Sequence, residues 1–329
     1  MKKAFLSALL VVLAACTREP SPVVLTSLIL SPPAPVQTRA GDPDDSKITD
    51  YNLYLFNSFG ILEERVYVPY RSLKLTDGKV QYSTTLLRDV PYTILAVANL
   101  GYEVPLRSLE EARSFRYHLA YPDEFTQGLP MAAFLQDIRV GEAALVEVPL
   151  ERLMARIELR IDRSDLLADI QFKVTEVRVG ACPSSVQLVA PSKVNSREET
   201  FGLGYGKSGA QVSALNEDAG DGLSRSLSVY LLENRQGDLL DNVITDSGKV
   251  FYEAFYREVC SYIEIKAEYH SPTWHTPVGG RLIYRFYLGE SLNNFDVCRN
   301  TWYRVTVRPQ GDGLGEDSWR VDKSALTDS

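Results

Sequence analysis

Short runs of β-branched and aromatic residues recur along this chain, separated by turn residues, and this pattern constrains the fold more than any other feature. Such side chains pack well on a pleated sheet, so each run is predicted to be a strand. The clearest runs cover residues 48–56, 66–68, 80–87, 92–99, 144–150, 153–161, 170–179, 227–232, 261–269, 281–288 and 302–307. We therefore predict a mainly β protein.

Two of these runs also predict how their faces are covered. Residues 92–99 are apolar at every position except the ends and one threonine, which is typical of a central strand covered on both sides. Residues 153–161 alternate apolar with charged side chains, which predicts one buried and one solvated face.

One segment has a helical pattern. Ser108 and Glu111 have the spacing of a capping box, and apolar residues follow at helical intervals at Leu109, Ala112, Phe115 and Leu119. Pro122 would end this helix. We expect a single crossover helix within a β-rich domain.

The length of 329 residues suffices for two domains of ordinary size. We predict two β-sandwiches in tandem, over residues 41–158 and 159–329, with the helix in the first. Residues 180–222 are rich in glycine, serine and acidic residues and are predicted to be a long, partly mobile connection. Residues 311–329 are mostly polar, with Trp319 and Val321 close together among them, which predicts a short closing strand or a frayed end.

The first fifteen residues read as an export signal. Two lysines precede an apolar run over residues 4–12, and Leu13, Ala14 and Ala15 lead to Cys16. The run is short of the roughly 20 residues that a transmembrane helix needs. A cysteine at the cleavage point makes residues 1–15 similar to a bacterial lipoprotein signal, which implies cleavage before Cys16 and its acylation. The alternative is a signal peptide that ends near a cysteine by chance.

Residues 16–40 follow this signal and contain a second apolar run. Residues 23–30 would span roughly 26 Å as a strand and could complete a sheet through main-chain hydrogen bonds. We expect a displaceable strand whose apolar residues are Val23, Val24, Leu25, Leu28, Ile29 and Leu30. Prolines at positions 32, 33 and 35 would keep the connection that follows extended and exposed. The alternative is a permanent first strand.

Beyond Cys16 the chain has three cysteines, Cys182, Cys260 and Cys298, and none has the spacing of a zinc site. In an exported protein, one bridge between Cys260 and Cys298 and three buried free thiols both fit this pattern.

Charge and motifs argue against several functions. The net charge of −8, without a long basic run, argues against a nucleic-acid surface. The chain has three histidines, His118, His270 and His275. The residues near them in the sequence are not those typical of a metal site or a catalytic triad. Residues 204–209 formally match GxGxxG, but no helical pattern follows, so a flexible loop is expected. We expect no enzymatic activity, no cofactor and no metal.

Several blocks, in a consistent order, resemble the fimbrillins and fimbrillin-like surface lipoproteins of Bacteroidales. They lie at residues 37–48, 54–57, 96–101, 129–131, 153–157, 232–237, 295–300 and 303–307. The resemblance implies two transthyretin-like β-sandwich domains and an outer-membrane lipoprotein precursor that reaches the cell surface and its fimbrium. It also implies that a trypsin-like protease cuts between Arg39 and Ala40. A donor strand from another fimbrial subunit then fills the groove left by residues 23–30.

The polar carboxy-terminal segment departs from polymerising subunits, where a longer apolar donor segment is expected. This departure predicts a minor, tip or accessory subunit. The alternative is a monomeric surface lipoprotein that binds glycans or a host protein through loops such as residues 270–279, around Trp274.

Overall fold

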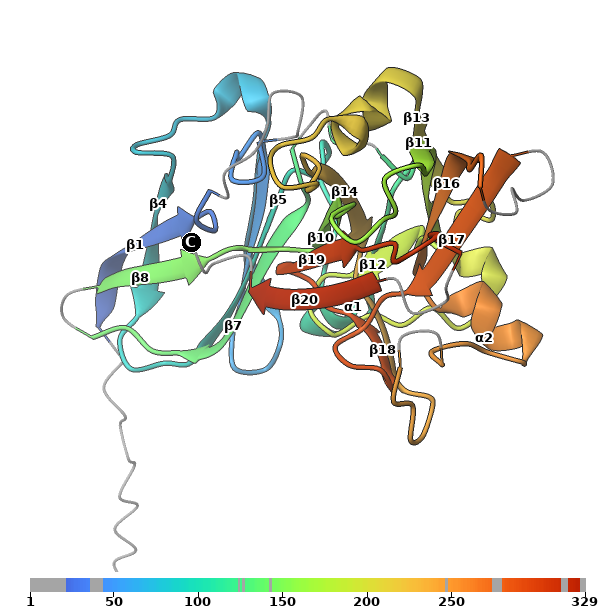
Figure 1. Cartoon of the computed structure of the whole chain (residues 1–329). Helices are drawn as coiled ribbons and strands as arrows, with labels where there is room; N and C mark the ends of the chain where they lie inside the picture. Colours follow the sequence, from blue (N-terminus) through green and yellow to red (C-terminus); the bar gives the residue numbers. More distant parts are fainter. Residues whose placement is uncertain are drawn as a thin grey trace, which may run out of the picture.

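The computed structural model describes residues 22–35, 44–123, 125, 128–141, 144–245, 248–273, 280–314 and 319–325 (Figure 1). The chain is mainly β, as predicted. Within these ranges no helix is both long enough and apolar enough to cross a membrane.

Two sheets enclose the core of the amino-terminal half. The larger has the order β3-β2-β5-β7-β9 and the smaller has the order β4-β1-β8. Their apolar faces meet in one cluster that includes Leu30, Leu53, Ile94 and Val148. The strands are β1 (Val23–Ser31), β2 (Tyr51–Phe56), β3 (Leu62–Val68), β4 (Val80–Leu87), β5 (Tyr92–Ala98), β7 (Met131–Ile138), β8 (Ala144–Pro149) and β9 (Glu151–Arg152).

Two four-stranded sheets enclose a second core in the carboxy-terminal half. One has the order β14-β10-β19-β20 and the other β13-β11-β16-β17. Their strands are β10 (Met154–Ile161), β11 (Gln171–Gly180), β13 (Tyr205–Ser208), β14 (Leu227–Leu232), β16 (Tyr262–His270), β17 (Arg281–Tyr287), β19 (Thr301–Val307) and β20 (Trp319–Ala325). A small ladder joins β15 (Asn234–Asp238) to β18 (Asn294–Val297).

The two halves share a third apolar cluster. Leu95 and Val97 of β5 pack there with Met154 and Leu232 of the carboxy-terminal half. A two-stranded ladder between β6 (Arg116–His118) and β12 (Ser185–Gln187) also connects the halves. Since Ile94 faces the first core, β5 is covered on both sides, as predicted.

The chain passes from one half to the other at Leu153. β9 pairs with β7 of the first sandwich, whereas β10 pairs with β14 and β19 of the second. The expected boundary after residue 158 therefore falls inside β10. The first sandwich also takes its strand β1 from residues 16–40, outside the range 41–158 expected for it.

The predicted helix forms, but it is short. In α1 (Leu109–Ser114) the Ser108 hydroxyl accepts a hydrogen bond from the Glu111 N–H at 3.2 Å, and the Glu111 carboxylate accepts one from the Arg107 N–H at 2.7 Å. The prediction that the helix continues to Leu119 is wrong, because Phe115 is extended and β6 begins at the next residue. Tyr117 reaches the shared cluster from this strand.

The amino-terminal half has the one predicted α-helix, and a second α-helix that the sequence did not reveal, α2 (Ala254–Val259), lies in the carboxy-terminal half. Three short 3₁₀ helices cover Tyr70–Ser72, Arg197–Glu199 and Gly209–Asn216. Residues 204–209 were expected to be a flexible loop, but Tyr205–Ser208 form the strand β13 and the last 3₁₀ helix begins at Gly209.

The expected solvated face of residues 153–161 is not found either. Arg156 and Glu158 are both buried although they alternate with apolar residues. The Arg156 guanidinium lies 5.2 Å from the centre of the Trp302 ring and bonds the Ser228 hydroxyl at 3.0 Å. Because β10 is an inner strand, the long side chains of its neighbours cover its polar face.

Candidate functional site

β1 is the central strand of its sheet (Figure 1). It pairs antiparallel with β4, from Val23 opposite Leu87 to Leu30 opposite Val80. On its other side it pairs parallel with β8, from Thr26 opposite Ala144 onward. Loss of β1 would therefore break two ladders and leave β4 and β8 with unpaired edges facing one gap.

The two faces of β1 have different surroundings. Leu28 and Leu30 are fully buried in the first core, and Val24 is partly buried beside them. Val23 and Leu25 point outward and are 67% and 72% exposed. The six residues expected to form the apolar strand thus divide between two faces.

Thr26 also belongs to the inward face, which the sequence reasoning missed. It is fully buried, and its hydroxyl donates to the Val24 carbonyl at 3.3 Å. The strict alternation of strand side chains places positions 24, 26, 28 and 30 on one side, which a search for apolar residues alone overlooks.

The cleavage site expected at Arg39 and Ala40 lies in residues 36–43, outside the described part, as does Cys16. The residues on either side of this segment are held by a single side chain. One Arg152 guanidinium nitrogen donates to the Ala34 carbonyl at 2.7 Å, and Nε donates to the Asp45 carbonyl at 2.7 Å. Arg152 also pairs with the Asp45 carboxylate at 3.1 Å. We call this set of contacts the Arg152 clasp.

The Arg152 clasp is buried and also reaches the second half of the chain. The Arg152 side chain is fully buried, and its Nη1 donates to the Asn300 side-chain oxygen at 3.2 Å. Burial lowers the pKa of Arg152, and the nearby Asp45 charge opposes this shift. The sequence signal that could have pointed to it is weak: the charged pair Glu151-Arg152 interrupts apolar residues at Leu150 and Leu153.

A second polar network fixes the chain that follows. The Asn99 side chain accepts a hydrogen bond from the Thr49 N–H and donates one to the Lys47 carbonyl, each at 2.8 Å. The Asp50 carboxylate accepts from the Gly101 N–H at 3.1 Å. Burial raises the pKa of Asp50, and this hydrogen bond opposes the rise. The residues after the expected cleavage site are thereby anchored independently of β1.

The structure has no Cys260–Cys298 bridge, because Cys182, Cys260 and Cys298 are all free thiols. Cys260 is buried in an aromatic cluster, whereas Cys298 is partly exposed and its sulfur lies 2.9 Å from a Glu290 carboxylate oxygen. Burial raises the pKa of both Cys182 and Cys260 to about 12.

No group of three or more potential metal ligands occurs among the residues that the structure describes. His118 lies in β6 and His270 ends β16, both with exposed side chains. His275 and Trp274 fall outside the described residues.

No characterised protein matches the chain significantly in sequence. A family model described as a domain of unknown function, DUF4906, matches residues 229–307.

Solved structures match over nearly the whole chain. The tip fimbrial protein Mfa3 from Porphyromonas gingivalis has a TM-score of 0.57 and 11% identity, with 92% of this chain and 99% of that chain covered. A candidate cell adhesion protein from Bacteroides eggerthii has a TM-score of 0.55 and 16% identity, with 93% and 96% covered. The fimbrilin FimA from P. gingivalis W83 has a TM-score of 0.53 and 13% identity, with 91% and 96% covered. The resemblance to fimbrillin-like proteins is thus confirmed at the level of the fold.

Proposed function

We propose that this chain is a fimbrial subunit with an adhesive role, exported as an outer-membrane lipoprotein acylated on Cys16. A trypsin-like protease cuts it after Arg39, β1 leaves, and a donor strand from another fimbrial subunit takes its place. The polar composition of residues 311–329 supports a minor, tip or accessory position in the fibre.

The observation that carries this proposal is the place of β1 in the sheet. A strand at the start of the chain, hydrogen-bonded on both sides, can leave without unthreading any other element. Its departure opens a groove lined by the core residues that contact Leu28 and Leu30. A strand with apolar residues at the same alternate positions would restore both ladders and refill the core.

The fold similarity supports the architecture on which the proposal depends, since the matched structures include fimbrial proteins. At identities of 11–16% it supports the architecture alone. Export, cleavage and strand exchange therefore rest on the sequence of residues 1–40 and on the position of β1.

Intact-mass analysis of protein recovered from the cell surface tests the processing step. We expect mature chains that begin at Ala40, and an Arg39→Ala variant that keeps an acylated Cys16. Arg71→Ala, at an exposed arginine of the first sandwich, is the control and should mature as the parent does. Mixing cut protein with partner subunits should give oligomers that resist heat and detergent. An Arg39→Ala chain that matures and assembles like the parent would refute processing at this position.

Retention of residues 16–40 in every recovered chain, with no oligomers, would instead favour the alternative function. That function is a solitary surface lipoprotein that binds a glycan or a host protein through its loops.

A further inference from the structure

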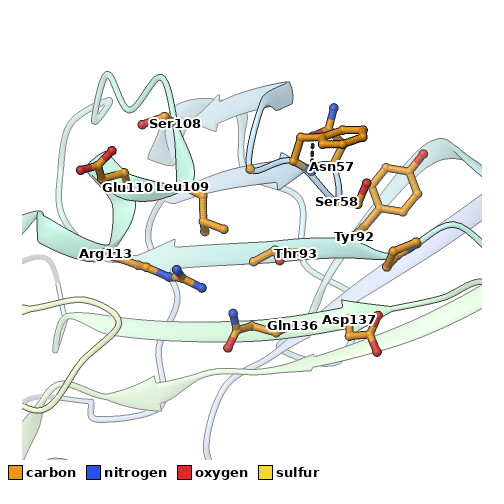
Figure 2. A pocket seen from close by; sticks show the side chains of 13 residues that line it. Asn57, Ser58, Tyr92, Thr93, Ser108, Leu109, Glu110, Arg113, Gln136 and Asp137 are labelled. Carbon is orange, nitrogen blue, oxygen red and sulfur yellow. Dashed lines mark hydrogen bonds between the residues drawn. The ribbon is translucent and has the colours of Figure 1, made fainter.

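A groove of about 750 Å³ lies at one end of the five-stranded sheet, next to α1 (Figure 2). The turn at residues 57–60, the start of β5, the helix α1 and residues 136–137 of β7 line it. It is far in sequence from the β1 segment, and strand exchange makes no use of it.

The turn at residues 57–60 presents an exposed aromatic ring on a fixed backbone. The Asn57 side-chain oxygen accepts hydrogen bonds from the N–H groups of Phe59 at 3.0 Å and Ile61 at 3.1 Å. Gly60 has a φ of +74°, and its carbonyl accepts a hydrogen bond from the Leu109 N–H at 3.1 Å. The Phe59 side chain is nevertheless 86% exposed. Little entropy would be lost on binding, because this turn is already ordered.

The strands beneath the groove are irregular at this end. The register between β5 and β7 shifts between Tyr92 and Ile94, so Thr93 lies at a bulge. Asp137 has a φ of +54° and pairs with Arg139 at 3.1 Å. Bulges at sheet ends commonly redirect side chains next to binding sites. Here they leave an open surface beside α1.

Several polar side chains along the groove are free to bind a ligand. Within the described part of the chain, Glu110, Arg113 and Gln136 make no side-chain hydrogen bond or ion pair. Figure 2 shows Arg113 reaching from α1 over the strands that carry Thr93 and Gln136. Arg113 can donate hydrogen bonds, Glu110 can accept them, and the Gln136 amide can donate and accept.

We propose that this groove binds a glycan. A sugar ring has one apolar C–H face, which fits the exposed Phe59 ring, and hydroxyl groups at its edge, which need both donors and acceptors. The lining meets both needs. Glu110 balances the charge of Arg113, and Arg139 pairs with Asp137, so the groove has no excess of positive charge that would favour a phosphate-rich ligand. The many polar groups disfavour a purely apolar ligand. The inference rests on the adhesive part of the proposed function and not on strand exchange.

A glycan array probed with the chain from residue 16, carrying Cys16→Ser to prevent acylation, tests the groove. We expect the array to identify at least one bound glycan. Calorimetry then measures the affinity of the chain for that glycan. Phe59→Ala and Gln136→Ala should each weaken its affinity at least tenfold. Tyr252→Ala removes an aromatic ring that is 92% exposed elsewhere and is the matched control, with unchanged affinity expected.

An array without signal for the parent chain would overturn the proposal, as would variants Phe59→Ala and Gln136→Ala that bind like the parent. The same two variants should assemble normally with partner subunits. Glycan binding without assembly would refute strand exchange and leave the groove assigned. Assembly without glycan binding would refute the groove alone.

Discussion

Leu28 and Leu25 lie in the same strand on opposite faces, so they form a matched pair for testing how β1 is held. Leu28 is fully buried in the first core, whereas Leu25 is 72% exposed. Truncation of a buried leucine to alanine costs about 2–5 kcal/mol, from lost transfer energy and the cavity that remains. Truncation of an exposed leucine changes stability by roughly 0.5 kcal/mol or less. Both variants keep the backbone ladders, so the difference reports side-chain packing alone.

The assay is urea unfolding followed by far-ultraviolet circular dichroism, in an Arg39→Ala background so that β1 stays attached. We expect Leu28→Ala to lower the free energy of unfolding by about 3 kcal/mol, which reduces the ratio of folded to unfolded chains about 100-fold. Leu25→Ala should match the parent. Equal losses for the two variants, or a larger loss for Leu25→Ala, would show that β1 does not pack through positions 24, 26, 28 and 30.

Three further predictions follow from the buried polar and thiol groups. Arg152→Ala removes the buried guanidinium that pairs with the buried Asp45 carboxylate, so the free energy of unfolding in urea should fall by about 3–5 kcal/mol. A loss under about 1 kcal/mol would show that the Arg152 clasp contributes little to stability. Burial raises the pKa of Cys182 and Cys260 from 9.0 to about 12. The folded chain therefore binds more protons than the unfolded chain between these values, and its stability should fall as the pH rises through this range; a flat profile would contradict this. A thiol reagent should label Cys298 in the folded chain, but Cys182 and Cys260 only after unfolding, as read by mass spectrometry; an unreactive Cys298 would indicate a bridge.

The sequence predicted correctly those strands and helix caps that depend on residues close together in the chain. The strand predicted at residues 80–87 is β4 with the same bounds, and its inward residues Val80 and Leu86 are buried. Half of the predicted Ser108–Glu111 capping box forms, since the Ser108 hydroxyl accepts a hydrogen bond from the Glu111 N–H. The Glu111 carboxylate accepts from the Arg107 N–H, one residue before the N-cap, and both bonds need no distant residue.

Elements whose environment comes from distant residues were missed or misread. β7 begins Met131-Ala132-Ala133 and is buried on both faces there, so its sequence has no alternation to detect. Residues 115–119 keep helical spacing, but Tyr117 and Leu119 enter the shared cluster from an extended segment. Tertiary packing overrides a weak local preference in such cases.

The parts of the β1 segment, the groove and the Arg152 clasp that depend on distant residues could not be predicted from the sequence. The apolar run of β1 is visible in the sequence, but the division of its faces depends on which strands flank it. The groove beside α1 collects residues from four segments, and no local motif marks it. The Arg152 clasp has only a weak sequence signal, a charged pair at residues 151–152 between two leucines.

The Arg152 clasp also bears on what cleavage after Arg39 would leave behind. Among the residues that the structure describes, Arg152 bonds the strand side of the segment at the Ala34 carbonyl and the body at Asp45 and Asn300. A cut would therefore free β1 of its covalent link while the new amino-terminal segment stays tied to the core. The groove walls, β4 and β8, are strands of the body and are not themselves cut. Because β4 and β8 both pair with β1 in their sheet, a replacement strand would have to restore both ladders, and its affinity would depend on how well its alternate side chains match Val24, Thr26, Leu28 and Leu30.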